Sequence, residues 1–298
     1  MAAGAERSSA DRGPTVFEAS MALESLGGGT YERDIDQTWW GWNGQFGGYI
    51  LALVLEACRG EIAPLAPDHR ERALTLHFMR RFSEGRLRIE VTTERAGRTV
   101  TNVSFRLFVN DKVSGVGVAL FASDRHSEQF QAAEPPDLTP PAADEAPQPS
   151  PIPAAALEHF DIWPRHQGAM FSGSEVSESG GWMRLKEAGG ADERFLFFPA
   201  DGYVPAAHLR LTQPSVGGTL DFTAHFREPV PASIADEGDP VRVRLRVARA
   251  ATGYIDEDAE IWSADGRLLM QSRQTRYNEI IDMAALAELA DSEGPSTK

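Results

Sequence analysis

The chain has 298 residues, of which 42% are hydrophobic and 24% charged, a composition typical of a globular protein of about two domains. Its 29 Lys and Arg against 44 Asp and Glu give a net charge of −15, which argues against non-specific nucleic-acid binding, because phosphates need basic surface. The single cysteine, Cys58, excludes an intramolecular disulfide and a cysteine zinc cluster. The N-terminus lacks an apolar signal-peptide core and no run of 18 apolar residues occurs, so we expect a soluble, cytoplasmic protein without a membrane span.

The first strong element in the chain is an apolar segment over residues 46–59, FGGYILALVLEACR. It is longer than a typical strand and apolar nearly all round, which predicts a buried helix that ends near Gly60. Further along, apolar and polar residues alternate, with Leu87, Ile89 and Val91 on one face, which is typical of half-buried antiparallel strands. A helix that is apolar on every side has to be covered, so we expect a sheet to curl around it.

A proline-rich acidic segment separates two parts of the chain. Eight of the 19 prolines lie between Pro135 and Pro153, with acidic and small residues between them. Proline lacks an amide donor and fixes φ, so such a segment does not form a strand or helix of a core. It predicts an exposed linker over residues 126–159.

The parts before and after the linker repeat the same features in the same order. Three pairs match: Gly47-Gly48-Tyr49 with Asp201-Gly202-Tyr203, His77-Phe78 with His225-Phe226, and a turn at Asn110-Asp111 with one at Asp265-Gly266. The first two pairs are offset by 154 and 148 residues. Alternating strand patterns also return in the second part. Together these matches indicate a duplicated unit.

Several stretches carry a family resemblance through their order and spacing. They are Phe46-Gly47-Gly48, LHFMR at 76–80, ERAGR at 94–98, TLD at 219–221 followed by HFR at 225–227, and GRLL at 266–269 leading to Gln274. In these the chain resembles the acyl-CoA thioesterase II family, whose members are double hotdogs. The resemblance implies an α+β fold of two tandem hotdogs, each an antiparallel sheet wrapped around one long buried helix.

The expected organisation follows from the resemblance and the linker. It comprises a tail and lead-in (1–36), a first hotdog (37–125), the linker (126–159), a second hotdog (160–282) and a C-terminal tail (283–298). By analogy with the family we expect a homo-oligomer, a dimer of double hotdogs. The implied reaction is hydrolysis of a fatty acyl-CoA to the free acid and CoA, with no metal ion or organic cofactor.

The resemblance also implies a site that holds the hydrolytic water. The family places an Asp at the start of the second helix, a Thr on the next strand and a Gln on the last strand, which match Asp201, Thr219 and Gln274. Asp201 would accept the proton of the water, while the hydroxyl and the amide orient it. In the first copy, Gly47 stands opposite Asp201 and Leu120 opposite Gln274, so only the second copy would have the polar set.

Each of these residues also has a purely structural interpretation. Asp201 would equally serve as an N-cap of its helix. The Gly47, Gly48 and Tyr49 segment favours either an oxyanion and substrate site at the helix N-terminus or a tight entry into the helix. Thr219 and Gln274, each taken by itself, would be ordinary polar residues of a strand.

Basic residues gather in the first half, against the sign of the whole chain. Arg80 and Arg98 are candidates to receive the phosphates of CoA, and the alternative is a solvated sheet face. Two departures from the family pattern, Phe222 in place of a common His and Tyr49 in place of a common Gln, leave acyl-chain preference open. Two other functions stay open as well: a non-catalytic acyl-CoA-binding hotdog protein, and an enoyl-CoA hydratase-type hotdog enzyme, which would want an Asp/His pair.

Overall fold

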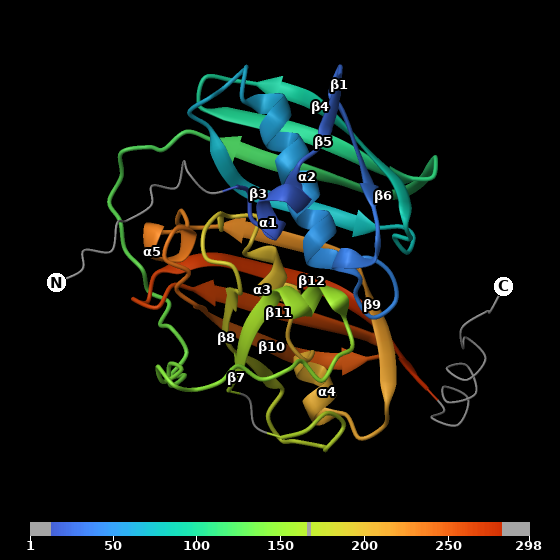
Figure 1. The fold of residues 1–298 in the computed structure, drawn as a ribbon, viewed down its shortest axis with the longest axis vertical. Helices are drawn as coiled ribbons and strands as arrows, with labels where there is room; N and C mark the ends of the chain where they lie inside the picture. The colour runs from blue at the N-terminus through green and yellow to red at the C-terminus, as the bar shows by residue number, and fades with distance from the viewer. Residues whose placement is uncertain (1–12, 166–167, 282–298) are drawn as a thin grey trace.

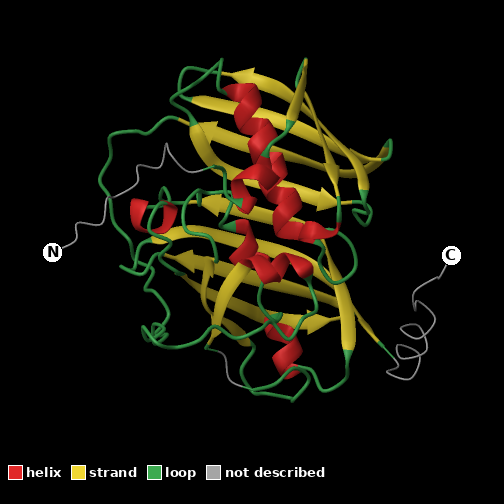
Figure 2. Cartoon of the chain, in the orientation of Figure 1, coloured by secondary structure: helices red, strands yellow, loops and turns green. Residues whose placement is uncertain are grey.

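A single twisted antiparallel sheet of 12 strands forms the body of the molecule (Figure 1). The computed structural model describes residues 13–165 and 168–281. From edge to edge the strand order is β1-β2-β4-β5-β6-β3-β9-β12-β11-β10-β8-β7. In the part of the chain that the structure describes, helices gather on one face of this sheet, and the long helix α2 (Gly47–Ile62) runs across its upper part (Figure 2).

The first half contributes the strands from β1 to β6. Its elements are α1 (Val16–Met21), β1 (Glu24–Gly27), β2 (Thr30–Ile35), η2 (Gln37–Trp39), α2 (Gly47–Ile62), β3 (Arg70–Phe78), β4 (Gly85–Ala96), β5 (Val100–Val109) and β6 (Lys112–Ala122). Strands β1 and β2 extend the sheet beyond β4, so the segment 1–36, which the sequence suggested to be a tail and lead-in, contains two strands and a helix.

The second half contributes the remaining strands and several short helices. Its elements are η3 (Ala155–His159), β7 (Phe160–Pro164), β8 (Glu178–Leu185), α3 (Phe197–Asp201), α4 (Ala206–Arg210), β9 (Ser215–Phe226), α5 (Ala232–Ala235), β10 (Val241–Ala251), β11 (Tyr254–Trp262) and β12 (Leu268–Ile280). Within the described ranges no helix has the length and apolarity needed to cross a membrane.

Helix α2 is the buried helix that the sequence predicts, and it is 16 residues long. Its central residues, among them Leu51 and Leu55, are fully buried. It does not stop at Gly60 but continues to Ile62. Gly60 serves packing instead, because a Cβ there would lie 2.9 Å from the hydroxyl of Tyr31 on β2.

The two halves join at the centre of the sheet, where β3 pairs with β9. Thr75 pairs with Thr223, and their hydroxyl oxygens are 3.0 Å apart. These two residues are 148 positions apart, the same offset as the His-Phe motifs. A duplicated unit with two-fold pseudosymmetry requires that a strand pair with its own counterpart, as β3 does with β9.

The second half departs from the first in its helix. Instead of one long buried helix it has two short ones, α3 and α4, separated at Pro205. Proline has no amide to donate and its ring excludes a continuous helix at this point. As a result Asp201 is the last residue of α3 and not the first residue of a helix, so the expectation that it begins the second helix is wrong.

The linker lies along the second half and is fixed there by its carbonyl groups. The indole of Trp163 donates to Glu145 O at 3.0 Å, and the indole of Trp182 donates to Thr139 O at 3.0 Å. In Figure 1 the linker descends along one side of the molecule from the upper to the lower half. The segment contains no strand or helix up to η3, as its prolines predict.

Candidate active site

The carboxylate of Asp201 lies at the N-terminus of helix α2, which belongs to the other half. Its Oδ2 is 2.7 Å from the point that a Cβ would occupy at Gly47. The amides of Gly48 and Gly47 hydrogen-bond to it. Asp201 therefore caps a helix, but the helix is α2 and not its own. The close approach depends on the missing side chain of Gly47.

Burial raises the pKa of Asp201 above its usual value, and three kinds of neighbour oppose this shift. They are the positive charge of Arg276, the hydrogen bonds of the two glycine amides and a hydrogen bond from Gln274. The side chain of Asp201 is 11% exposed, so it is nearly enclosed. A carboxylate with a raised pKa and limited solvent contact has the properties of a general base.

Three neighbouring strands bring Thr219, Gln274 and Glu257 together. Thr219 Oγ1 donates to Gln274 Oε1 at 2.8 Å, and Gln274 Nε2 donates to Glu257 Oε1 at 3.2 Å. Gln274 is 1% exposed and pairs directly with Glu257 across β12 and β11. Because its oxygen accepts from Thr219 and its nitrogen donates to Glu257, the orientation of the Gln274 amide is fixed.

Glu257 and Arg276 belong to this cluster, although the sequence analysis did not single them out. Arg276 Nη1 lies 3.6 Å from Asp201 Oδ1 and 3.4 Å from Glu257 Oε1. Glu257 Oε2 also accepts from the amide of Ala206, at the start of α4, at 2.7 Å. Burial raises the pKa of Glu257, whereas Arg276 and the Ala206 amide act against that rise. One guanidinium is thus shared by two buried carboxylates.

A signal for Glu257 exists in the sequence. On β11 the buried positions alternate through Ile255, Glu257 and Ala259, so a glutamate occupies a position that should be apolar. On β12, Arg276 follows Gln274 by two residues and therefore lies on the same face of the sheet. A buried charge on an alternating strand calls for a partner, and here the partners are on adjacent strands.

A hollow of about 310 Å³, which we call the proximal pocket, opens beside these residues. Gly47, Thr219, Arg80 and Tyr277 are among its lining residues. Arg80 is exposed and its Nε donates to Val113 O at 3.1 Å. Arg80 thus lines the same hollow as Gly47, the residue that Asp201 contacts.

Two other candidates lie elsewhere. Tyr49 is 2% exposed, stacks on Trp39, and its hydroxyl donates to Ser20 O at 3.3 Å, so it belongs to the core. Arg98 lies in the turn after β4, where its carbonyl contacts the ring of His69 at 3.3 Å. His69 immediately precedes β3, a strand of nine residues that ends at Phe78, beside Gly47. The two ends of β3 are about 30 Å apart. Arg98 is therefore remote from Asp201.

The corresponding place in the first half holds no such set of residues. The pseudo-two-fold relation that exchanges Thr75 and Thr223 also exchanges Leu74 and Phe222. Phe222 pairs with Gln274, whereas Leu74 pairs with Ala119. The counterpart of Gln274 is thus Ala119 and not Leu120, a correction of one residue. Neither could orient a water through a side-chain amide, and the polar set remains specific to the second half.

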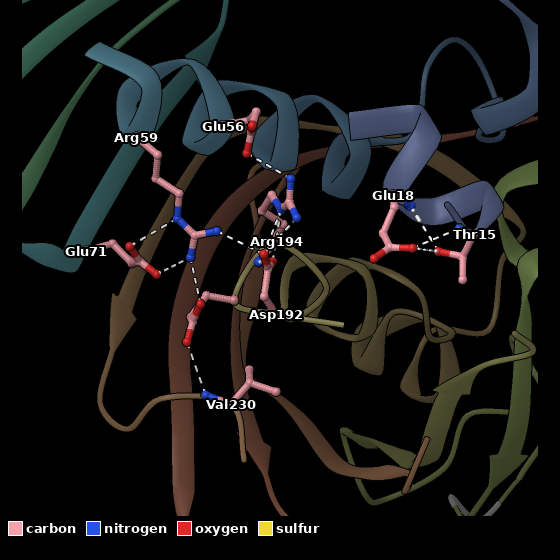
Figure 3. A network of polar contacts seen from close by, with 9 residues as sticks. Thr15, Glu18, Glu56, Arg59, Glu71, Asp192, Arg194 and Val230 are labelled. Carbon is pink, nitrogen blue, oxygen red and sulfur yellow. Dashed lines mark hydrogen bonds and ion pairs between the residues drawn. The ribbon is translucent and has the colours of Figure 1, made fainter. Parts of the chain in front are cut away.

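The counterpart of Thr219 is Glu71, which belongs to an ionic cluster between the halves (Figure 3). Arg59, near the end of α2, contacts Glu71 at 2.5 Å, Asp192 at 3.0 Å and Glu193 at 2.6 Å. Arg194 joins Asp192 to Glu56 on α2. These ion pairs join helix α2 of the first half to residues 192–194 of the second, so the cluster holds the two halves together.

Two family models match consecutive parts of the chain. The model of the acyl-CoA thioesterase N-terminal domain matches residues 36–122, and that of the acyl-CoA thioesterase C-terminal domain matches residues 134–277. The chain belongs to the acyl-CoA thioesterase family. No curated protein matches its sequence.

Solved structures agree with this fold. A hotdog protein of unknown function from Alicyclobacillus acidocaldarius is 25% identical, with a TM-score of 0.79, and the match covers 90% of this chain and all of that one. A putative thioesterase II from Thermobifida fusca YX is 24% identical, with a TM-score of 0.73, and the match covers 89% of this chain and 97% of that one. An acyl-CoA thioesterase II from Mycobacterium marinum is 16% identical, with a TM-score of 0.68 and coverage of 90% and 99%. This acyl-CoA thioesterase family member is therefore a double hotdog, as the sequence predicts.

The groups around Asp201 are a hydroxyl, an amide and a guanidinium. Among the residues that the structure describes, no three His, Cys, Asp or Glu side chains are grouped as a metal site. Around Asp201 of this acyl-CoA thioesterase family member, the carboxylate can accept a proton, and Arg276 and the N-terminus of α2 can stabilise negative charge.

Proposed function

We propose that this protein hydrolyses fatty acyl-CoA to the free acid and CoA, using Asp201, Thr219 and Gln274 to activate a water molecule. The observation that carries the proposal is the position of Asp201, a buried carboxylate at the N-terminus of a helix from the other half, next to a fixed Gln274 amide. Family membership supplies the substrate class.

In the proposed reaction, the water lies between Asp201, Thr219 and Gln274. As its oxygen attacks the thioester carbonyl carbon, Asp201 takes up one of its protons. The charge that develops on the carbonyl oxygen is stabilised by the positive end of α2 and by Arg276. When the tetrahedral intermediate collapses, the carbon–sulfur bond breaks and the proton passes from Asp201 to the departing CoA sulfur.

The proximal pocket supports this arrangement, because it connects the reacting residues with cationic side chains. Arg80 and Arg81 line it together with Gly47 and Thr219. We propose that the phosphates of CoA lie at these arginines while the thioester reaches Thr219. No comparable observation supports either alternative function. A hydratase, for example, would want a histidine beside Asp201, but the neighbours of Asp201 are Arg276, Gln274 and glycine amides.

A free-thiol assay with a panel of acyl-CoA esters tests the proposal. We expect the full chain to release CoA from at least one ester with multiple turnovers. A well-folded protein that binds the esters but releases no CoA from any of them would instead be an acyl-CoA-binding protein.

A further inference from the structure

A second hollow lies at the other end of the central strands β3 and β9, and we call it the basic hollow. Its volume is about 700 Å³, against about 310 Å³ for the proximal pocket. Four arginines are among its lining residues: Arg70, Arg72, Arg125 and Arg227. Because the whole chain has a net charge of −15, four guanidinium groups around one hollow call for an explanation.

The basic hollow is the counterpart of the proximal pocket under the pseudo-two-fold relation. The offset of 148 residues between β3 and β9 relates Arg70 to Gly218 and Arg72 to Leu220. Even the irregularities correspond, because the pairing of β3 with β6 skips Arg72 and the pairing of β9 with β12 skips Leu220. Three further lining residues of the proximal pocket, Met79, Arg80 and Arg81, have their counterparts in the basic hollow at Arg227, Glu228 and Pro229.

The residues proposed to hold the water have no equivalents beside the basic hollow. Gln274 corresponds to Ala119, and Thr219 corresponds to Glu71, whose carboxylate lies 2.5 Å from Arg59. Cationic side chains line both hollows, although they come from different positions of the two copies. The basic hollow therefore has the place and charge of a substrate entrance without the reacting groups, which suits binding and not catalysis.

The arginines are arranged to receive anionic oxygens. A single carboxylate oxygen, Asp124 Oδ1, accepts from both Arg70 and Arg72, at 2.8 Å and 2.5 Å. Asp124 is 72% exposed, so a phosphate can take its place between the two guanidinium groups. Arg125 and Arg227 each donate to a neutral side-chain oxygen, at 2.9 Å and 3.1 Å, and within the described ranges neither forms an ion pair with a carboxylate.

The hollow also contains two exposed acids and an exposed aromatic ring. The acids are Glu128 and Glu228, and water screens their charges. The ring is that of Phe130, which is 90% exposed. Its backbone is held in place, because the next residue, Gln131, donates to Gly266 O at 3.0 Å. Nucleobases stack on aromatic rings of this kind, so the ring together with the arginines fits a phosphorylated nucleotide.

We propose that the basic hollow binds the phosphorylated nucleotide end of CoA and is a second, non-catalytic CoA site. The phosphates lie at the four arginines, and the adenine ring stacks on Phe130. The choice of CoA among nucleotides rests on the proposed thioesterase function, since the substrate and one product of that reaction carry this nucleotide. The geometry of the hollow does not depend on that function.

Titration calorimetry of the full chain with CoA tests the proposal. We expect two CoA molecules per chain, one in the proximal pocket and one in the basic hollow, and Arg80→Gln should weaken only the first. At the basic hollow, dephospho-CoA should bind at least about tenfold more weakly than CoA, the effect of losing one charge-assisted hydrogen bond. ADP, the other source of the same chemistry, should also bind more weakly than CoA, and pantetheine, which has no nucleotide, should not bind there.

Variants locate the second CoA. Arg70→Gln combined with Arg227→Gln should reduce the stoichiometry from two to one, whereas Arg106→Gln, at an exposed arginine that lines neither hollow, should leave it at two. Asp124→Asn should tighten binding at the basic hollow about threefold to fivefold, because a competing carboxylate is neutralised. Phe130→Leu should weaken CoA about fivefold without changing the affinity for inorganic phosphate, which does not stack. Thermal unfolding of each variant confirms that the fold is intact.

Several outcomes would overturn the proposal. They are a single CoA per chain up to millimolar CoA, a second CoA that persists in the double arginine variant, or equal affinities of ADP and CoA at the basic hollow. The free-thiol assay keeps this proposal apart from the thioesterase function. Hydrolysis by a chain that binds one CoA would reject the second site alone, and two bound CoA molecules without hydrolysis would reject the thioesterase function alone.

Discussion

The sequence offers two interpretations of Asp201, a helix cap and a catalytic base. In the structure Asp201 caps helix α2 and lies beside Gly47, a lining residue of the proximal pocket. The helix that it caps belongs to the other half, so the carboxylate depends on both copies of the fold. This arrangement explains why a side chain at the end of a five-residue helix is held in a defined position.

Asp201→Asn separates the two roles. We expect turnover to fall about 10²- to 10⁴-fold, because an amide cannot accept the proton of the water. Since the pKa of Asp201 is raised, ionising it costs more in the folded than in the unfolded chain, so at pH 7 the neutral amide should leave the unfolding temperature equal or higher. Steady-state kinetics and thermal unfolding measure the two effects, and near-normal turnover would reduce Asp201 to a cap.

Glu257→Gln tests whether the Arg276 guanidinium is shared between Asp201 and Glu257. Without the second negative charge, Arg276 acts on Asp201 alone and the pKa of Asp201 falls, so the acidic limb of the kcat/KM profile should move to lower pH. Turnover at the plateau should fall about tenfold, because a hydrogen bond to a charged group that orients Gln274 is weakened.

Asp256→Asn on the outer face of the same strand is the control for Glu257→Gln and should change neither quantity. Because Asp201 and Glu257 lie near one guanidinium, their profile reports the pair and not one residue. An unshifted acidic limb with normal turnover would show that Glu257 only supports α4 through the Ala206 amide.

At the scale of elements, the contact between α2 and α3 decides the geometry of the site. Two adjacent glycines on α2 face α3 and differ in what a methyl group would meet. At Gly47 it would meet the Asp201 carboxylate at 2.7 Å, and at Gly48 it would meet the backbone carbonyl of Phe197 at 2.8 Å. A carboxylate can rotate away, whereas a helix backbone cannot.

Gly47→Ala should therefore change mainly turnover, and Gly48→Ala mainly stability. Gly47→Ala should lower kcat by tenfold or more through displacement of Asp201, with little loss of stability, since alanine favours a helix by about 1 kcal/mol over glycine. Gly48→Ala should lower the free energy of unfolding by about 1–3 kcal/mol, the usual cost of overpacking. Urea unfolding and kinetics distinguish them, and Gly13→Ala, which meets nothing within 4 Å, is the control.

At the scale of the whole molecule, the pseudo-two-fold relation places a site on one side and an ionic cluster on the other. The cluster around Arg59 joins α2 of the first half to residues 192–194 of the second (Figure 3). Such a bridge is expected to contribute to the association of the halves, because Arg59 pairs with three carboxylates and Arg194 with two.

Arg59→Met leaves Glu71, Asp192 and Glu193 close together with one fewer cation. We expect it to lower the free energy of unfolding by about 1–3 kcal/mol at pH 7, less than a fully buried pair because the Arg59 side chain is 26% exposed. Without Arg59 the pKa of Glu71 rises further above its unfolded value, so the deficit should shrink as pH falls through that pKa. Urea unfolding at pH 7 and pH 5 checks the sign; a pH-independent deficit would point to lost packing.

Assembly is a further prediction at this scale, and it rests on family analogy. We propose a dimer of double hotdogs, for which light scattering should give about twice the chain mass of 32.5 kDa. A monomeric mass at micromolar concentration would contradict it.

The sequence alone determined the architecture, because apolar periodicity is a local property of the chain. The all-round apolar segment 46–59 predicted α2, alternation predicted the strands and prolines predicted the linker. The ordered repeats predicted a duplicated unit, and the family resemblance implied that this unit is a hotdog. The sequence also singled out Asp201, Thr219 and Gln274, through their resemblance to family motifs.

Only the tertiary structure decided how these residues meet. The break at Pro205, the cap of α2 by Asp201 and the pairing of Glu257 with Gln274 and Arg276 join segments up to about 150 residues apart, and no local pattern records such contacts. Contacts of this kind also explain why Arg98 and Tyr49 lie outside the site. Residue type and spacing fix which face of a strand or helix a side chain occupies, but which faces meet is decided by the packing of the whole sheet.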